Sequence, residues 1–276
     1  TIPIYMIQNS IGDELISQLV SGVLLKLSVN TITTSTPTVT NIEQVYLTVR
    51  DFSSNIDGFT SFAGMQQPGT SSTLDPLREP VMNWPEIRKV GDDIYGFGAW
   101  TSNSLNSSSN TLTEVVWVVL KYDTSNESWS VFQNGEVTFQ GTGSEAGLSM
   151  FMPGISMDYN GYLYIICSGT SSSYGPAVYF TRKAFEDTVF PNPIRIKDAE
   201  GVQTFSSRFG DYYSCQSNIP NTAVGVAEIA TFSGQWEAYT FKMAFPGIHF
   251  EFEPADINQE TQIVLTITSG GTVPEP

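Results

Sequence analysis

The sequence has few charged residues and very few basic ones. Asp, Glu, Lys and Arg make up 14% of its 276 residues, well below the roughly 25% of an average soluble protein. Only 12 Lys and Arg stand against 28 Asp and Glu, which gives a formal net charge of −16 at pH 7. Nucleic acids and anionic membrane surfaces are bound by basic faces. We therefore expect neither as a partner.

The scarcity of Lys and Arg has a second consequence. In strong acid the carboxylates are neutral and every basic group adds to self-repulsion. A chain with few basic groups carries less of this repulsion. With a surface rich in Ser, Thr, Asn and Gln in place of charges, this composition predicts an extracellular or cell-surface protein. An acidic medium is a further hypothesis.

Cysteine and histidine are nearly absent. Cys167 and Cys215 each follow an apolar or aromatic run, and His249 is the single histidine. Without a Cys-x-x-C motif, a zinc or haem site has little support. The two cysteines either form a disulfide that closes a long loop or remain two buried thiols.

Long apolar runs are also missing. No stretch of 18 apolar residues occurs in the sequence, so we expect no membrane-spanning helix. Asn-x-Ser sequons occur at Asn106 and Asn126, each within a polar stretch. They are candidate glycosylation sites in exposed loops.

Short strand-forming segments fill most of the chain. Runs of Val, Ile, Tyr, Phe, Trp and Thr alternate with clusters of Gly, Pro, Asn and Ser, which indicates an all-β fold. The best short helical candidate is Ile11 to Leu19. The pairs Asn134-Gly135 and Asn160-Gly161 predict hairpin turns, because such turns need positive φ at both central residues.

One unit occurs twice in the sequence. Trp84-Pro85-Glu86-Ile87 and Met152-Pro153-Gly154-Ile155 each precede a polar turn and then an aromatic strand. Proline is tolerated where a strand begins but not in its middle. Repetition of such units is typical of four-stranded blades. We expect a β-propeller-like fold of about five or six blades, with a large β-sandwich as the alternative.

The C-terminus changes character after Pro246. We expect a propeller-like domain over residues 1–246, followed by a strand pair and linker tail over residues 247–276. The alternating segments His249 to Phe252 and Gln262 to Thr268 either complete the main fold or pair with a neighbouring copy by strand addition. They also fit a processed fragment of a larger multidomain surface protein.

Several segments resemble a family of secreted sialidase-like β-propeller proteins. The residues that carry this resemblance are Pro153 to Asp158, Asn160 to Leu163, Val178 to Arg182, Ser207 to Tyr212 and the strand around Trp236. The run Arg208-Phe209-Gly210-Asp211-Tyr212 is the most specific piece. The resemblance implies a propeller fold, an extracytoplasmic location and, in many members, no demonstrated enzymatic role.

These segments supply the candidate binding residues. Arg182, Arg208, Asp211 and Tyr212 are candidate ligand contacts, although Arg208 and Asp211 also fit a structural ion pair next to Gly210. The turn that carries Asp158 and Asn160 offers oxygen ligands for Ca²⁺, and it equally fits an ordinary Asx turn. No other cofactor is expected.

The enzymes of this fold combine an arginine cluster, a tyrosine nucleophile activated by glutamate and an aspartic acid. The repeated Ser-x-Asp-x-Gly-x-x-Trp turns of sialidases are missing here, and the nearest stretch, Asp123 to Trp129, lacks the glycine. We therefore favour a non-enzymatic role in recognition, adhesion or assembly of a surface layer or filament, with a glycan or a surface protein as the partner. A glycan-processing hydrolase of sialidase-like fold is the alternative.

Overall fold

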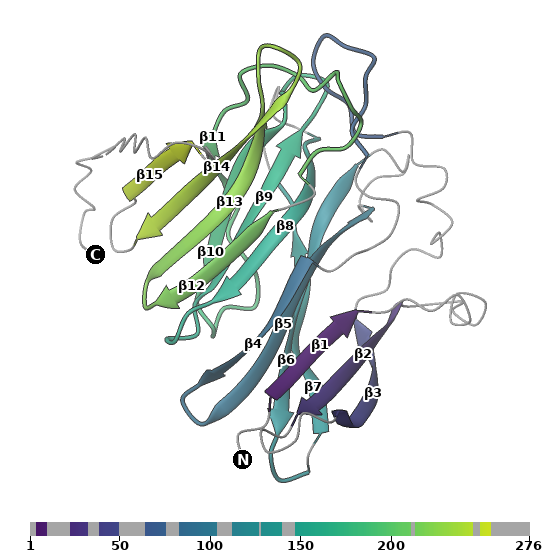
Figure 1. Ribbon diagram of the computed structural model, residues 1–276, viewed down its shortest axis with the longest axis vertical. Coiled ribbons are helices and arrows are strands. Elements are labelled where there is room, and N and C mark those ends of the chain that lie inside the picture. Colours follow the sequence, from purple (N-terminus) through teal and green to yellow (C-terminus); the bar gives the residue numbers. More distant parts are fainter. Residues whose placement is uncertain are drawn as a thin grey trace.

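The fold consists of antiparallel β-sheets. A computed structural model describes residues 4–9, 23–32, 39–49, 64–75, 83–103, 112–126, 128–139, 147–210, 213–244 and 249–254. This part of the chain contains strands and turns but no helix (Figure 1). It accordingly offers no helix that could cross a membrane. The prediction of an all-β fold is confirmed, and the helical candidate Ile11 to Leu19 lies outside the described residues.

The strands form four sheets, each built from strands consecutive in sequence. The first sheet holds β1 (Ile4–Asn9), β2 (Val23–Ile32) and β3 (Val39–Val49). The second holds β4 (Asn83–Val90), β5 (Asp93–Asn103), β6 (Thr113–Asp123) and β7 (Ser128–Val137). The third holds β8 (Ser149–Met157), β9 (Leu163–Thr170), β10 (Ala177–Lys183) and β11 (Ile194–Lys197). The fourth holds β12 (Ser214–Ile219), β13 (Thr222–Ala230), β14 (Trp236–Ala244) and β15 (His249–Pro254).

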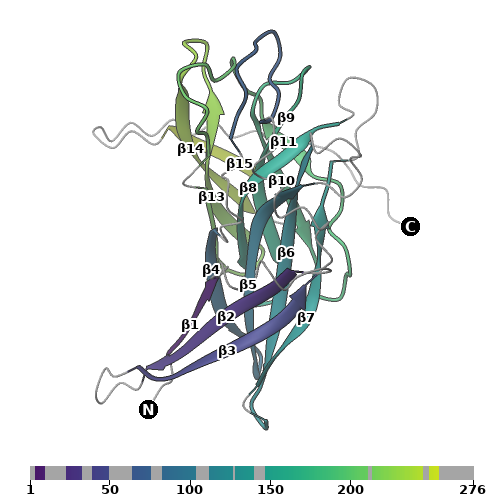
Figure 2. The same ribbon diagram turned by 90° about the vertical axis from the view of Figure 1, so that its right-hand side faces the viewer.

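Three successive four-stranded meanders are the arrangement of propeller blades. In a Greek-key sandwich, strands distant in sequence pair within one sheet, whereas every strand pair here joins neighbours in the chain. The prediction of a propeller-like fold is confirmed at this level. The described residues form four sheets, which do not close into a ring. The two views agree that β1–β3 lies beside the lower end of the β4–β7 sheet (Figure 2).

The repeated sequence unit occupies the same place in two sheets. Pro85 lies in β4 and Pro153 in β8, and each of these strands is the first of its sheet. Register shifts fall between Asn83 and Glu86 and between Phe151 and Gly154, where β4 pairs with β5 and β8 with β9. A bulge is where proline, which donates no backbone hydrogen bond, is tolerated within a strand.

The core has two layers, one on each face of the β8–β11 sheet. Along β9, Leu163, Ile165 and Cys167 pack toward the β4–β7 sheet, and Tyr164 and Ile166 pack toward the β12–β15 sheet. Successive side chains of a strand point to opposite faces. A strand buried on both faces therefore becomes a continuous apolar run, as Leu163 to Cys167 of β9 is.

This two-layer core explains why the disulfide prediction is wrong. Cys167 belongs to the layer next to the β4–β7 sheet, and Cys215 on β12 belongs to the other layer. Both are free thiols. Burial raises the pKa of both thiols, so they are inert groups that fill space in the core.

One of the two predicted hairpin turns is also wrong. Asn160-Gly161 lies in the turn between β8 and β9. Gly161 has φ +85°, but Asn160 does not have the positive φ that was expected of both residues. Asn134-Gly135 instead lies inside β7. Gly135 pairs with Trp117 across the strands, and a Cβ atom there would come within 3.1 Å of the indole. The glycine is needed because the indole lies over it, so its presence does not mark a turn.

The C-terminal segment joins the fourth sheet. β15 pairs with β14 from Tyr239–Pro254 to Ala244–His249. This agrees with the alternative in which this segment completes the main fold. The domain boundary at residue 246 stays a prediction, and Gln262 to Thr268 lies outside the described residues.

Candidate functional site

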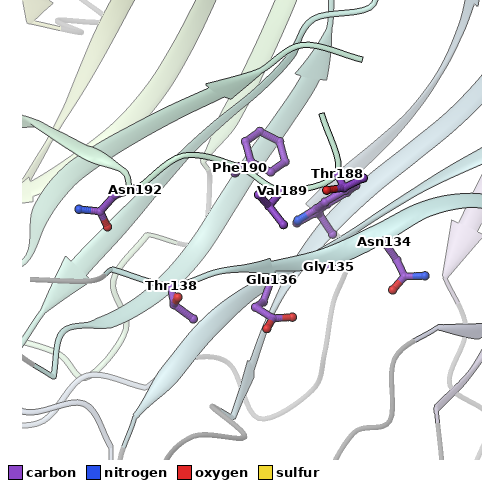
Figure 3. Close-up of a pocket in the computed structure, with 9 residues that line it drawn as sticks. Asn134, Gly135, Glu136, Thr138, Thr188, Val189, Phe190 and Asn192 are labelled. Carbon is purple, nitrogen blue, oxygen red and sulfur yellow. The ribbon is translucent and has the colours of Figure 1, made fainter. Parts of the chain in front are cut away.

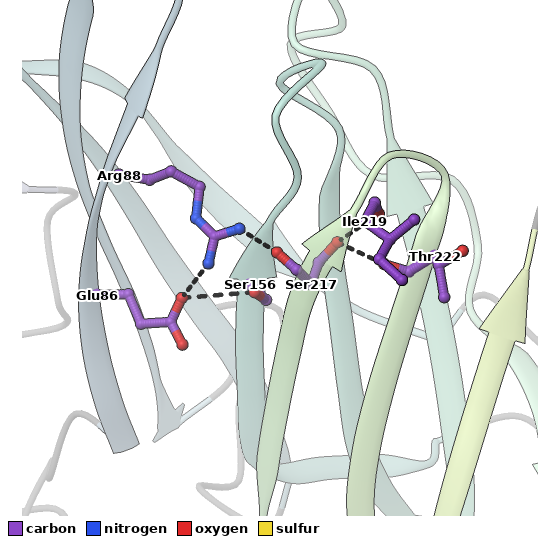
Figure 4. A network of polar contacts seen from close by, with 6 residues as sticks. All are labelled: Glu86, Arg88, Ser156, Ser217, Ile219 and Thr222. Atoms are coloured by element: carbon purple, nitrogen blue, oxygen red, sulfur yellow. Dashed lines mark hydrogen bonds and ion pairs between the residues drawn. The ribbon is translucent and has the colours of Figure 1, made fainter.

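The first strands of three sheets lie side by side and share a polar cluster. β8 contacts both β4 and β12, which is the place of the channel-lining strands in a propeller. We call Glu86, Arg88, Ser156 and Ser217 the junction cluster (Figure 4). Glu86 and Arg88 alternate along β4, so both side chains point to the same side of the strand.

Hydrogen bonds tie the junction cluster together across the three strands. Arg88 donates to the backbone carbonyl of Ser217 on β12 and pairs with Glu86 Oε2 at 3.4 Å (Figure 4). The Ser156 hydroxyl on β8 donates to the same carboxylate oxygen at 3.5 Å. Ser217 in turn donates to the carbonyl of Thr222, closing the hairpin between β12 and β13. The cluster therefore fixes the spacing of the three sheets.

Within the junction cluster, the environment of Glu86 disfavours the charged form of its carboxyl group. Burial raises the pKa of its carboxyl group, and the Arg88 charge and the hydrogen bonds from Ser156 and Arg88 lower it by less. Its side chain keeps 22% of its exposure and that of Arg88 keeps 13%. A carboxyl group in this setting is both accessible and easily protonated.

The turn after β8 is locked by one carboxylate. Asp158 is fully buried. Its Oδ1 accepts from the backbone N–H of Asn160 and of Tyr162, each at 2.9 Å. Its Oδ2 accepts from the Tyr164 hydroxyl and from the backbone N–H of Asn221, each at 2.8 Å. The turn is thus held rigidly to β9 and to the hairpin after β12.

This rigid turn presents an exposed aromatic ring beside the junction cluster. Tyr159 is 55% exposed, and the Arg88 guanidinium carbon lies 5.3 Å from its ring centroid. A second arginine–tyrosine pair lies nearby. Arg182 Cζ is 3.7 Å from the centroid of the ring of Tyr162, three residues after Tyr159. Arg182 also donates to the Asn221 side chain at 3.0 Å. Such pairs are stabilised by cation–π attraction.

The structure brings Arg182 to this site but not Arg208. Arg182 contacts Asn221, just beyond the last residue of β12, whereas Arg208 precedes the first residue of β12 and forms an isolated backbone β-bridge with Asp75. The two arginines therefore belong to different ends of that strand. Asp211 and Tyr212, predicted to act with Arg208, lie outside the described residues, so their role stays a prediction.

The predicted Ca²⁺ ligands Asp158 and Asn160 lie in a turn that is held by hydrogen bonds. Both oxygens of Asp158 already accept two donors each, and Asn160 is exposed. Within the described ranges, no group of three or more His, Cys, Asp or Glu is placed to hold a metal ion. The Ca²⁺ role of Asp158 and Asn160 stays a prediction, and the geometry is that of an Asx turn.

The glycosylation of Asn106 and Asn126 stays a prediction. Asn126 is exposed in the turn between β6 and β7, where its side-chain amide donates to Asp123 Oδ2 at 2.7 Å. Exposure is what a glycosylated asparagine requires. Asn106 lies outside the described residues.

Sequence reasoning missed Glu86, Arg88 and Ser217. The sequence did contain a signal for Glu86 and Arg88. The repeated Pro-x-Ile unit marks β4 and β8 as equivalent strands, and the polar residues of these two strands lie beside each other. Ser217 had no such signal, since its contribution is a backbone carbonyl that any residue type would provide.

Comparisons with known proteins give only distant likenesses. No protein-family model matches the sequence, and no curated protein matches it. Similar solved structures include an α-L-arabinofuranosidase from Lactobacillus brevis, at TM-score 0.39 and 10% identity over 86% of this chain and 63% of that one. They also include a Trypanosoma rangeli sialidase, at TM-score 0.35 and 12% identity over 69% of this chain and 34% of that one.

A third similar structure is AofleA from Arthrobotrys oligospora, at TM-score 0.28 and 9% identity over 89% of this chain and 51% of that one. The chain thus spans less than two thirds of the length of all three proteins. A sialidase, the family indicated by the sequence resemblance, is among the similar structures. At these TM-scores the likenesses carry no argument about activity, which must come from the site itself.

Proposed function

We propose that the protein is an extracellular β-propeller-like recognition protein that binds a glycan at the junction cluster, with Tyr159 as its contact ring. The observation that carries the proposal is an exposed aromatic ring on a turn that Asp158 holds rigid with four hydrogen bonds. A tyrosine presents a large aromatic face together with a polar hydroxyl group, which suits contact with a ligand. A ring that is already ordered loses little conformational entropy on binding.

The groups around Tyr159 suit a sugar. The C–H face of a sugar ring packs on an aromatic face, while its hydroxyl groups need donors and acceptors at the rim. Arg88 supplies a donor and Glu86 an acceptor within the same cluster. The negative net charge of the chain disfavours anionic polymers as ligands.

A panel of immobilised glycans tests this proposal. Wild-type protein is expected to bind at least one glycan, and Tyr159→Ala to weaken that binding tenfold or more, because it removes the contact ring and leaves the turn intact. Phe232→Ala is the matched control, since Phe232 is also an exposed aromatic residue in a turn, after β13. Equal loss in both variants, or no loss in Tyr159→Ala, would contradict the proposal.

A glycan-processing hydrolase is the second candidate, and the environment of Glu86 is what favours it. A carboxyl group whose pKa is raised by burial is suited to general acid catalysis. Glycoside hydrolysis needs a second carboxylate, and the neighbouring Asp158 is fully occupied by its four donors. We therefore rank recognition first. Release of a fluorophore from aryl glycosides, abolished in Glu86→Gln, would reverse this order.

A further inference from the structure

Two phenylalanines at one end of the molecule stand out into solvent. Among the described residues, Phe232 and Phe205 are the most exposed large apolar side chains, at 88% and 82%. Phe232 lies in the turn between β13 and β14, which is at the upper end of the molecule in both views (Figures 1 and 2). Phe205 lies in the loop between β11 and β12. We call segments 201–207 and 231–236 the aromatic tip.

Hydrogen bonds hold the two segments of the aromatic tip against each other. The backbone N–H groups of Thr204 and Phe205 both donate to the carbonyl of Gly234, at 3.0 and 3.1 Å. The glycine is required there, because a Cβ atom on it would lie 2.3 Å from Thr204 Oγ1. Phe205 and Phe232 are therefore displayed from one joined pair of loops. A single exposed apolar residue needs no explanation, whereas a group of them marks a contact surface.

Several backbone groups of the aromatic tip are already paired within the chain. Besides the two bonds to Gly234, the Thr231 N–H donates to the Gln235 carbonyl at 2.9 Å and the Gly234 N–H donates to the Thr231 carbonyl at 3.1 Å. Backbone groups that enter an apolar environment must be paired inside the protein, because no water is there to replace a partner. These bonds therefore lower the cost of removing the tip from water.

The aromatic tip lies in an uncharged part of the surface. Loop 64–74 borders it through Gln67, whose side-chain amide donates to the Gln203 carbonyl at 2.8 Å, and loop 171–176 packs against it as well. These two loops and the tip contain no Asp, Glu, Lys or Arg, although such residues make up 14% of the chain. Removing a charge from water is costly, so this end of the molecule leaves water more easily than a surface of average composition.

The apolar part of the aromatic tip is small for a stable protein interface. Such an interface buries about 800 Å² on each partner and takes roughly 20–30 residues from it, whereas the tip offers two phenyl rings and Trp236, which is 48% exposed. Binding to a lipid bilayer instead scales with the apolar area that enters it and needs no complementary shape. Tryptophan is also enriched at the boundary between membrane and water.

The charge of the chain selects the kind of bilayer. The protein carries a formal net charge of −16, so a bilayer of anionic lipids would repel it. The charged residues that flank the tip in sequence are Glu200, Arg208 and Glu237, which do not form a basic cluster. A bilayer of zwitterionic lipids has no net charge and therefore suits an uncharged tip on an acidic protein.

We propose that the aromatic tip docks on a zwitterionic lipid bilayer, with Phe205 and Phe232 inserted among the lipid chains and Trp236 at the level of the headgroups. The turn that carries Tyr159 precedes β9, whereas loop 171–176 beside the tip follows it. The tip and Tyr159 are thus at opposite ends of the third sheet. Docking leaves the junction cluster accessible, and either proposal can fail without the other.

Co-sedimentation with phosphatidylcholine vesicles tests the proposal. We expect weak, reversible binding at millimolar lipid, because even a single acyl chain gives only marginal binding. The double variant Phe205→Ser/Phe232→Ser should weaken binding tenfold or more and leave the Tm unchanged, because both side chains are in solvent in the free protein. Ile219→Ser is the matched control. Ile219 is 63% exposed in the hairpin between β12 and β13, at the opposite end of β13, and this variant should bind like wild type.

A second lipid composition and a mass measurement separate this proposal from its alternatives. Replacing a third of the phosphatidylcholine by phosphatidylserine should weaken binding threefold or more at low salt, because the protein and the lipid then carry charge of the same sign. The proposal is overturned if wild type does not sediment with phosphatidylcholine vesicles, if the double variant binds unchanged, or if phosphatidylserine strengthens binding. It is also overturned if size-exclusion chromatography shows a wild-type dimer that the double variant loses, since the tip would then bind a second copy of the chain.

Discussion

The turn after β8 and the turn between β6 and β7 are each organised by an aspartate, but the two aspartates differ in burial. Asp158 is fully buried and accepts four hydrogen bonds, one of them from Asn221 in the hairpin after β12. Asp123 accepts hydrogen bonds from Ser125 and Asn126 and is exposed. Water can replace a lost partner at the surface, whereas a buried group that loses its partner stays unsatisfied. The buried aspartate therefore makes the turn after β8 a rigid platform for Tyr159.

The comparison predicts that removing Asp158 has the largest effect on stability. Asp158→Ala leaves the Tyr164 hydroxyl and three backbone N–H groups without their acceptor. At about 1–3 kcal/mol for each buried unsatisfied group, and without full additivity, we expect a loss of at least about 3 kcal/mol in the free energy of unfolding. Denaturant unfolding followed by tryptophan fluorescence measures this loss.

Asp123→Ala is the matched control. Asp123 also accepts several hydrogen bonds in a turn, from Ser125 and Asn126, but it is exposed. Water replaces the lost partners there, so the variant should unfold almost like wild type. If Asp158→Ala and Asp123→Ala lower the free energy of unfolding equally, the distinction between a buried and a solvated turn is wrong.

A smaller effect is expected from Glu86, and it depends on pH. Because burial raises the pKa of Glu86, the folded protein holds this proton more tightly than the unfolded chain. The resulting stability is fully present below the ordinary pKa of 4.5 and is lost as pH rises through the raised value. Wild type should therefore gain stability relative to Glu86→Gln as the pH falls from 7 to 4, measured as the difference in Tm.

The same titration tests the hypothesis of an acidic medium. A wild-type protein that is adapted to acid keeps its fold below pH 4, and loss of the fold there would contradict the hypothesis. A difference in Tm between wild type and Glu86→Gln that does not change with pH would show that burial of Glu86 does not bias its protonation.

The smallest effect on stability is expected at two exposed asparagines, Asn134 and Asn192. Both line a pocket between β7 and the segment after β10 (Figure 3), and each alanine variant should change the free energy of unfolding by no more than about 0.5 kcal/mol. Denaturant midpoints compared with wild type give the value. A loss above about 1.5 kcal/mol would mean that these exposed amides support the fold.

The sequence was most informative where local patterns decide structure. Alternation along the chain predicted the strands, and the repeated Pro-x-Ile unit predicted blade-like repetition. Pro85 and Pro153 do lie in equivalent strands, β4 and β8, but inside these strands at bulges and not at a strand beginning. The two thiols could not be placed by such patterns. Which of the two core layers Cys167 and Cys215 enter depends on how whole sheets stack, and that information is not local.

The sites were predicted less well than the fold, for a related reason. Asn134-Gly135 has the composition of a hairpin turn, yet packing of Trp117 over Gly135 overrides this local preference. The junction cluster joins residues from β4, β8 and β12, and one of its contacts is a backbone carbonyl. Arg182 and Asp158 were recognised as important, but their partner Asn221 is distant in sequence.

A structure of the protein with a bound glycan tests the central claim most directly. The account predicts a sugar ring packed on the exposed face of Tyr159, with Arg88 or Glu86 contacting its hydroxyl groups, and a turn after β8 unchanged from the free protein. A glycan bound elsewhere with Tyr159 left in solvent, or a turn that rearranges to admit the ligand, would contradict the claim that the junction is a rigid recognition platform.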